Sequence, residues 1–284
     1  MKITKETKFL IIGLGLIGGS YARALTKQGY EVSAITRSEE SISYAMQEKI
    51  IAKGTTKVTE EFVKDADIIV FALYPKVLLK WLEEYQHFLK PGALITDVTG
   101  VKGEVVPKVQ QMLRKDVEFI GAHPMAGREV YGVVNSDDKI FQGANYIVTP
   151  TSENTQEAIN TCKELGKILG FARISELSPS EHDDMIGFVS QLTHTIAVAL
   201  MTCNDNEHLV DYTGDSFRDL TRIARINEDM WSELFLMNKS ALLKQIDCFQ
   251  QELSNIRELL SEGNQEGLKE KMRLSTQRRK LFDK

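Results

Sequence analysis

The stretch Phe9-Leu10-Ile11-Ile12-Gly13-Leu14-Gly15-Leu16-Ile17-Gly18-Gly19-Ser20 decides the fold. Four apolar residues run directly into three spaced glycines, and a helical pattern follows, which predicts a strand, a tight turn and a helix. Gly13 permits the turn, Gly15 lets the backbone approach a pyrophosphate, and Gly18 lets the helix pack on the strand. The helix N-terminus then binds phosphate. We therefore expect a dinucleotide site formed by Gly13, Leu14, Gly15, Leu16, Ile17 and Gly18.

The bulk properties indicate an ordinary soluble protein. The chain has 284 residues, enough for two domains, and 42% of them are hydrophobic and 26% charged. A formal net charge of −5 disfavours nucleic acid as a partner. No apolar signal segment precedes Phe9, and no apolar run reaches membrane-spanning length. We therefore expect a cytoplasmic protein with no membrane partner.

The cysteines agree with that compartment. They are odd in number and far apart, so they suggest neither a disulfide framework nor metal-ligand spacing. We expect reduced thiols and no metal site. The residues are Cys162, Cys203 and Cys248.

The residues after the second predicted strand, 31–35, bear on the choice of cofactor. An NAD site usually has an acidic residue there, which bonds the ribose 2′-hydroxyl. This chain has Thr36-Arg37-Ser38 instead, with no carboxylate to repel a 2′-phosphate and an arginine that could bind one. The alternative is that Arg37 is an exposed loop residue without a role. We expect Thr36, Arg37 and Ser38 to contact the cofactor, which is NADP or NAD, with NADP favoured.

Further apolar runs at residues 67–73, 93–97 and 117–121 alternate with helical patterns, which predicts a doubly wound parallel sheet. Ligands of such sheets bind at the carboxyl ends of the strands, where Leu73 and Asp97 are expected to line the cofactor site. Strands at 144–150 and 171–174 and a helix at 155–169 complete this half. We assign residues 1–175 to a Rossmann-type dinucleotide-binding domain.

His123 is the candidate catalytic residue. It follows the predicted strand 117–121 by two residues, within His123-Pro124-Met125-Ala126-Gly127-Arg128-Glu129. A histidine at the carboxyl end of a strand lies near the expected nicotinamide and can exchange a proton near pH 7. The alternative is a loop histidine with a structural hydrogen bond.

The chain becomes helical from Ser178. Ser178 as N-cap, Pro179 at the first position and Glu181 at the third predict a helix that continues to about residue 201. His194 would be a polar group in its apolar wall, so it must be hydrogen-bonded or meet a ligand. Farther on, Arg218, Thr221, Arg222 and Arg225 recur at helical spacing. This stripe could bind an anionic substrate, or it could be an ordinary charged face.

One long helix is predicted at residues 229–260. Its apolar residues recur nearly every seven positions, as in a coiled-coil seam, which favours a subunit interface over an intramolecular core helix. We therefore expect residues 176–284 to form an all-α substrate and dimerisation domain of a homodimer. The seam residues are Phe235, Leu242, Ile246, Phe249, Leu253, Ile256 and Leu260.

Several motifs, in order along nearly the whole chain, resemble the prephenate dehydrogenase family. They are the glycine turn, residues 121–129, His182-Asp183, Ser190-x-x-x-His194, residues 217–224 and Trp231. The resemblance implies a Rossmann domain followed by a helical dimerisation domain. It also implies oxidative decarboxylation of prephenate to 4-hydroxyphenylpyruvate in tyrosine biosynthesis, with hydride transfer to NAD(P)⁺.

The resemblance also implies roles for individual residues. His123 resembles the catalytic histidine, and Arg222 resembles the arginine that binds a substrate carboxylate. In the substrate pocket, His194 resembles a lining residue and Glu129 the acidic residue at the entrance. Two further positions, Asp219 and Trp231, match residues that shape the pocket.

One departure from the family concerns the loop after residue 97. The family usually has a serine where this chain has Gly100, and that serine helps to hold the catalytic histidine and the substrate. Thr99 is one residue early, and whether its hydroxyl replaces the serine is left open. We include Thr99 among the candidate substrate-binding residues.

Three other functions are compatible with parts of the pattern. The first is an arogenate dehydrogenase, which acts on the amino analogue of prephenate. The second is a β-hydroxyacid-type dehydrogenase, whose catalytic lysine would have to be Lys239 or Lys244 in the seam helix. The third is a nucleotide-sensing protein without turnover, which the histidines and arginines disfavour.

Overall fold

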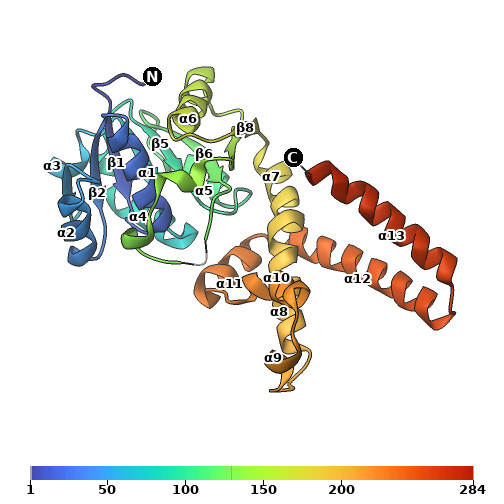
Figure 1. The fold of residues 1–284 in the computed structure, drawn as a ribbon. Coiled ribbons are helices and arrows are strands. Elements are labelled where there is room, and N and C mark those ends of the chain that lie inside the picture. The colour runs from blue at the N-terminus through green and yellow to red at the C-terminus, as the bar shows by residue number, and fades with distance from the viewer. Residues whose placement is uncertain (1, 129, 284) are drawn as a thin grey trace.

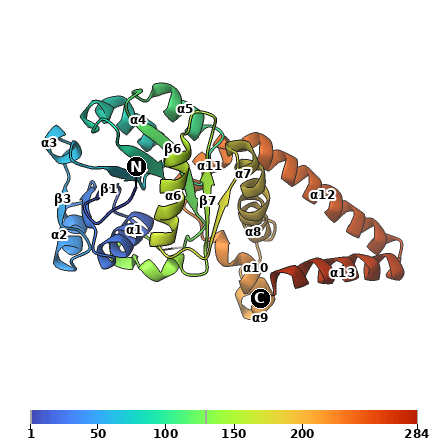
Figure 2. The same ribbon diagram turned by 90° about the horizontal axis from the view of Figure 1, so that it is seen from above.

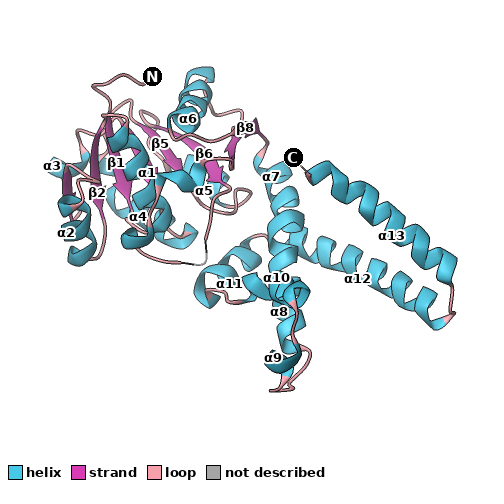
Figure 3. Cartoon of the chain, viewed as in Figure 1, coloured by secondary structure: helices cyan, strands magenta, loops and turns pink. Residues whose placement is uncertain are grey.

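The computed structural model describes residues 2–128 and 130–283. Its N-terminal part is a sheet with helices on both faces, and its C-terminal part is helical and extends away from the sheet (Figures 1 and 3). The chain passes between the two parts after β8 (Arg173–Glu176), so the expected boundary at residue 175 falls within that strand.

The sheet has eight strands in the order β3-β2-β1-β4-β5-β6-β7-β8. The strands before β8 are β1 (Lys8–Ile12), β2 (Glu31–Ile35), β3 (Lys53–Thr55), β4 (Ile68–Phe71), β5 (Leu94–Asp97), β6 (Glu118–Pro124) and β7 (Asn145–Thr149). The helices of this part are α1 (Leu16–Lys27), α2 (Glu39–Gln47), α3 (Glu60–Val63), α4 (Pro75–Tyr85), α5 (Val105–Met112) and α6 (Gln156–Ile168). The three-residue edge strand β3 was not predicted.

Helices pack on each face of the sheet because its central strands are apolar on both sides. All of β4 is buried, as its continuous apolar sequence predicts. Helices α1 and α6 contribute to the core on one face, and α4 and α5 to the core on the other (Figure 2). This confirms the predicted Rossmann-type fold.

The sheet departs from the all-parallel prediction at one pair of strands. Strands β1 to β6 are parallel where they pair, but β7 is antiparallel to β6 and parallel to β8. The segment between β6 and β7 contains short 3₁₀ turns and no α-helix among its described residues. Without a crossover helix, the chain returns in the opposite direction.

The helical part begins where the sequence predicts. Ser178 and Glu181 form a capping box at the start of α7 (Pro179–Ile186). A π-helical segment, Gly187–Leu192, joins α7 to α8 (Thr193–Thr202) without a break in the helical run. The remaining helices are α9 (Leu209–Tyr212), α10 (Asp215–Thr221), α11 (Glu228–Met237), α12 (Lys239–Ser261) and α13 (Gln265–Arg279).

The predicted single helix at 229–260 is wrong, because α11 and α12 are separate. They meet at Asn238, which is 6% exposed. Its Nδ2 donates to the Asp183 carbonyl at 2.9 Å and to Gln191 Oε1 at 2.8 Å. These buried hydrogen bonds to α7 and the π-helical segment hold the chain at the bend, which the apolar periodicity did not show.

The run Pro179–Thr202 also differs from the sequence expectation. It has 24 helical residues and a mean hydropathy of 1.4 in its most apolar window, so by length and composition it could cross a membrane. One such helix is weak evidence for a membrane segment. Here its polar residues have contacts in the protein: Gln191 donates to the Leu234 carbonyl, and His194 stacks on Trp231.

Candidate active site

The glycine turn between β1 and α1 has the geometry that a dinucleotide needs. Gly13 has φ +97°, and a Cβ there would lie 2.3 Å from the Ala72 carbonyl oxygen. A Cβ on Gly18 would lie 1.9 Å from the Gly13 carbonyl oxygen, so both positions require glycine. A Cβ on Gly15 would meet no described atom within 4 Å. Gly15 is the N-cap of α1 and has no side chain, which leaves the first N–H groups for a phosphate.

The other predicted residues around this turn differ in what they offer. Leu14 and Leu16 are buried, so they would contribute through their backbone. Ile17 lines the cavity described below. Leu73 packs on the turn, since its Cδ2 lies 2.8 Å from the position of a Cβ on Gly13.

The loop after β2 begins beside the turn. The Thr36 N–H donates to the Thr55 carbonyl of β3, and the Ser38 Oγ accepts from the Ser41 N–H as the N-cap of α2. Arg37 is exposed. The loop is therefore fixed at both ends by its backbone and its cap.

Asp97 holds the loop after β5 together. It and Lys102 are both 0% exposed. Its Oδ2 lies 2.6 Å from Lys102 Nζ, its Oδ1 accepts from the Ala122 N–H of β6 at 3.1 Å, and Lys102 Nζ also donates to the Ala122 carbonyl at 2.6 Å. A carboxylate engaged in this way positions the neighbouring strands, and a contact of Asp97 with the cofactor stays a prediction.

Thr99 belongs to the same buried group. Its hydroxyl bonds Asp97 Oδ2 and donates to the Val101 carbonyl at 3.0 Å, and the residue is 4% exposed. The hydroxyl is therefore used inside the loop, and a contact of Thr99 with substrate stays a prediction. Gly100 does lie beside His123: a Cβ on it would be 3.9 Å from the His123 Cε1.

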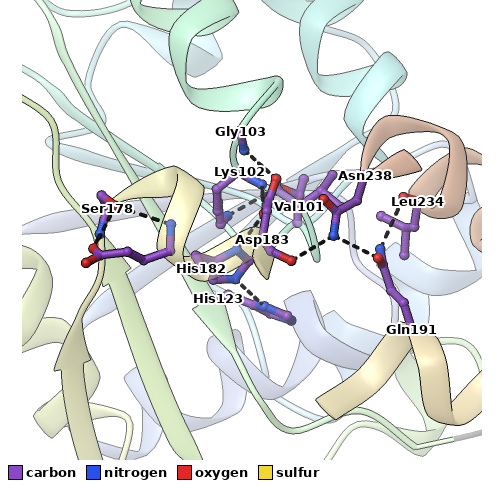
Figure 4. A network of polar contacts seen from close by, with 12 residues as sticks. Val101, Lys102, Gly103, His123, Ser178, His182, Asp183, Gln191, Leu234 and Asn238 are labelled. Carbon is purple, nitrogen blue, oxygen red and sulfur yellow. Dashed lines mark hydrogen bonds and ion pairs between the residues drawn. The ribbon is translucent and has the colours of Figure 1, made fainter. Parts of the chain in front are cut away.

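His123 lies inside β6, opposite Ile147 of β7, and not in a loop after the strand as predicted. Its Nδ1 is 2.9 Å from Nε2 of His182, a buried residue of α7. The Nδ1 of His182 is 2.7 Å from Asp183 Oδ1. Figure 4 shows this chain of contacts from β6 to α7.

The environment of the two histidines favours their neutral forms. Burial lowers the pKa of His123 well below its usual range, and the nearby His182 and Lys102 lower it further. Burial also lowers the pKa of His182, against the opposing effect of its hydrogen bond to Asp183. At pH 7, His123 can therefore accept a hydrogen bond or a proton from a ligand.

A cavity of about 380 Å³ lies between the sheet and the helical part. His123, Pro124 and Gly100 line it from the sheet side. Its walls include the predicted residues Ile17, His123, His194 and Trp231 and, in addition, Arg128, Tyr131, Ser190, Gln191, Arg225 and Asn227. Residues next to the glycine turn, the candidate base His123 and the basic residues Arg128 and Arg225 thus line the same cavity.

Two candidates on the helical side form an aromatic wall. The ring centroids of His194 and Trp231 are 3.7 Å apart with 29° between the ring planes. His194 Nδ1 also donates to the Ser190 carbonyl one turn earlier, at 2.9 Å. Stacking and this hydrogen bond fix the orientation of His194 at the cavity.

Arg222 and Asp219 lie elsewhere. Both are exposed, and neither lines the cavity. The predicted helical stripe is broken because α10 ends at Thr221 and Arg222 begins a 3₁₀ turn (Arg222–Ala224). That turn brings Arg225 to the cavity. Glu129 lies outside the described residues.

The sequence reasoning missed three contributions to the site. It included His182 in a motif but did not predict its contact with His123, and it did not predict the contact of Lys102 with Asp97. It also treated Arg225 as one member of a stripe. Only the spacing of His182-Asp183 at a helix start hinted at a role. Among residues 2–128 and 130–283, no group of three or more His, Cys, Asp or Glu side chains could hold a metal ion.

A dinucleotide turn beside a cavity with a neutral histidine and basic side chains defines the class of nicotinamide-dependent dehydrogenases. Comparison with known families specifies the member: residues 21–174 match the nucleotide-binding domain of prephenate dehydrogenase, and residues 178–274 match its dimerization domain. The chain belongs to the prephenate dehydrogenase family and is an NAD-dependent oxidoreductase.

Individual relatives agree with this assignment. Prephenate dehydrogenase of Bacillus subtilis is 33% identical over 276 residues, which cover 94% of this chain and 74% of that protein. Prephenate dehydrogenase of Lactococcus lactis is 34% identical over 256 residues, 88% of this chain and 70% of that protein. The crystal structure of Aquifex aeolicus prephenate dehydrogenase with hydroxyphenyl propionate and NAD⁺ has a TM-score of 0.91 and 31% identity, and covers 99% of this chain and 100% of that one.

Proposed function

We propose that this enzyme converts prephenate to 4-hydroxyphenylpyruvate and carbon dioxide in tyrosine biosynthesis, in the cytoplasm. The observation that carries the proposal is the neutral His123 in a cavity beside the dinucleotide turn. Membership of the family and the similarity to the Bacillus subtilis enzyme support it.

The turn fits a dinucleotide, because Gly13 and Gly18 have no room for a side chain and Gly15 faces open space. The backbone of residues 13–18 would hold the pyrophosphate at the N-terminus of α1. When bound, the nicotinamide accepts the hydride that the substrate loses. Thr36 and Arg37 would contact the adenosine ribose, and Arg37 is the residue that favours NADP.

His123 would act on the ring hydroxyl of prephenate. As hydride leaves the carbon that bears this hydroxyl, the C–O bond gains carbonyl character and its proton becomes more acidic. The neutral imidazole accepts the hydrogen bond and stabilises the developing positive charge. The ring carboxylate then departs as carbon dioxide, and its bonding electrons complete the aromatic ring. The product keeps a phenolic hydroxyl, so a proton that moves to His123 returns to that oxygen.

The two carboxylates of prephenate need cationic or donor partners. Arg225 and Arg128 line the cavity. Arg222 is the arginine that matches the family position. His194 and Trp231 would flank the substrate ring, because they form the aromatic wall. Asp219 and Glu129 stay proposed contributors to the shape of the pocket.

We also propose that the chain forms a homodimer through its helical part. The seam residues Phe249, Leu253 and Leu260 of α12 are 39%, 55% and 63% exposed in the single chain. A second copy would cover this apolar surface. The match to a dimerization domain supports the proposal.

A direct assay tests the function. Purified enzyme is mixed with prephenate and NAD⁺ or NADP⁺, and the absorbance of the reduced nicotinamide is followed. Arogenate, a β-hydroxyacid such as 3-hydroxyisobutyrate, and no substrate are the parallel arms. Reduction with prephenate is expected. Reduction with arogenate alone would assign the enzyme to that substrate, and none with any substrate would contradict a dehydrogenase role.

Replacement of the base sharpens the test. His123→Asn should lower kcat about 10²- to 10⁴-fold, because a group that stabilises the transition state is removed. Cofactor binding, measured by fluorescence, should stay unchanged and serves as the control. A kcat within about threefold of wild type would remove His123 from the mechanism.

A further inference from the structure

His182 is a buried polar residue that the proposed mechanism does not yet use. It is 0% exposed and lies between His123 of β6 and Asp183 of its own helix. Both of its ring nitrogens have partners: Nε2 is 2.9 Å from His123 Nδ1, and Nδ1 is 2.7 Å from Asp183 Oδ1. Such a fully engaged ring has one orientation.

Asp183 is itself held in place. Its Oδ1 accepts from the Lys102 N–H at 2.8 Å, and its Oδ2 accepts from the Gly103 N–H at 2.7 Å. The loop after β5 therefore fixes the carboxylate that faces His182, and Figure 4 shows these contacts converging on Asp183. The Asp183 carbonyl in turn accepts from Asn238, which ties this turn of α7 to the start of α12.

The hydrogen bonds determine which nitrogen carries each proton. A carboxylate only accepts, so the Nδ1 of His182 must be the protonated nitrogen. Burial lowers the pKa of His182, so at pH 7 the ring carries no second proton, and its Nε2 has a lone pair that accepts from His123. His123 must then carry its own proton on Nδ1. The remaining ring nitrogen of His123, Nε2, is left with the lone pair.

The residue at position 100 bears on how the His123 ring is oriented. Residue 100, in the loop after β5, is glycine. A Cβ at Gly100 would lie beside His123 Cε1, so the glycine leaves that side of the ring without a side chain to orient it. Within the described residues, the contact with His182 is the hydrogen bond that orients the ring.

We propose that His182, fixed by Asp183, is a positioning residue that keeps the proton of His123 on Nδ1 and its lone pair on Nε2. The use of that lone pair on a substrate hydroxyl rests on the proposed function, but the tautomer itself does not. His182 does not touch the reacting atoms. It acts by presenting His123 as an acceptor in every turnover, with no need to select a tautomer first.

The tautomer can be measured without substrate. In protein labelled with ¹⁵N-histidine, long-range ¹H–¹⁵N spectra distinguish the protonated from the unprotonated ring nitrogen. The signals of the two residues are assigned from their loss in His123→Asn and His182→Gln. His123 and His182 should each be protonated on Nδ1. A wild-type protein with His123 protonated on Nε2 would overturn the inference, whatever the enzyme's substrate.

A matched pair of variants tests the consequence for turnover. In His182→Gln, the side-chain oxygen can take the place of Nε2 as acceptor, so His123 should keep its Nδ1 proton and kcat should stay within about threefold. His182→Met has similar volume but offers His123 no comparable acceptor. It should lower kcat about 10- to 100-fold with KM within about twofold, and its His123 should show both tautomers.

The possible results distinguish a failure of the positioning role of His182 from a failure of the proposed function. A His182→Met enzyme with wild-type kcat, or a His182→Gln enzyme as slow as His182→Met, would contradict the positioning role. If the wild-type enzyme does not turn over prephenate, the proposed function fails. The tautomer measurement on the wild-type protein then still decides the inference.

Discussion

At the scale of single residues, the site depends on which side chains are charged. His123 is kept neutral by burial and by the nearby His182 and Lys102, whereas Arg225 brings a cationic guanidinium group to the cavity and Arg222, three residues earlier, lies outside it. The cavity therefore combines a neutral acceptor with cationic partners, which suits a dianionic substrate whose hydroxyl must give up electron density.

The two arginines can be compared directly. Arg225→Ala and Arg222→Ala should each raise KM for prephenate about tenfold or more, because a carboxylate loses a charged partner worth about 1.5–3 kcal/mol. Arg218→Ala is the matched control, since the Arg218 side chain is exposed and donates to the Thr213 carbonyl. If only Arg225→Ala changes KM, Arg222 does not bind substrate in this enzyme.

The cofactor prediction also belongs to one residue. Arg37→Ala should raise KM for NADP about ten- to a hundredfold and leave KM for NAD nearly unchanged, since a charge-assisted contact to the 2′-phosphate is lost. Initial rates with each cofactor at saturating prephenate measure this. A wild-type enzyme that strongly prefers NAD would show that Arg37 does not face the 2′ position.

At the scale of elements, the contacts between β6 and α7 join the sheet to the helical part. One of these contacts joins His123 to His182, and both histidines have lowered pKa values. Next to it, Asp183 of α7 is hydrogen-bonded to Asn238. Because Asn238 directly precedes α12, the same network sets the direction of the long C-terminal helices. The arrangement of the active site and the direction of the helical arm thus depend on the same buried polar groups.

These histidines predict how stability depends on pH. Their folded-state pKa values are lowered, so below about pH 6.5 the unfolded state binds more protons than the folded state. The contribution of these two histidines to stability should be constant above that pH and should fall as the pH decreases, by at most about 1.4 kcal/mol per pH unit for each histidine.

Urea unfolding at pH 7.5, 6.5 and 5.5 measures the effect. The His182→Gln variant is the control, because it removes one of the two titrating groups and should show a smaller loss on acidification. Equal losses in both proteins would mean that His182 does not contribute to the pH dependence.

At the scale of the whole molecule, α12 and α13 form a long hairpin that projects away from the sheet (Figures 1 and 2). Leu242, near its base, is 6% exposed and packs within the chain, whereas Phe249, Leu253 and Leu260 farther along α12 are exposed. The apolar seam predicted from the sequence therefore has two parts. The part around Leu242 belongs to the core of the chain, and the part farther along α12 is available to a second copy.

This division gives a sharper dimer test. Phe249→Glu with Leu253→Glu should convert a dimer into a folded monomer, because charge would be buried at the interface but not within the chain. Sedimentation at micromolar concentration measures the mass. Gln251→Glu, on an exposed part of the same helix, adds a charge outside the seam and should leave the dimer intact. A wild-type monomer would contradict the interface.

The sequence by itself determined the features that short-range physics controls. The strand, glycine turn and helix at residues 9–27 follow from local backbone geometry, since only glycine fits at Gly13 and Gly18. The capping box at Ser178 and the buried strand β4 follow from local hydrogen bonding and apolar composition. His123 was found by its motif and its place near a strand end. From these features the fold class and the family were both predictable.

Only the tertiary structure decided which distant groups meet. His123 and His182 are 59 positions apart in the chain, and no periodicity relates them, because their contact depends on how α7 packs against β6. The break at Asn238 depends on buried partners in α7 and the π-helical segment. The same holds for Arg225, which the 3₁₀ turn brings to the cavity in place of Arg222. Local patterns specify elements, whereas side-chain contacts between elements arise only when the elements pack.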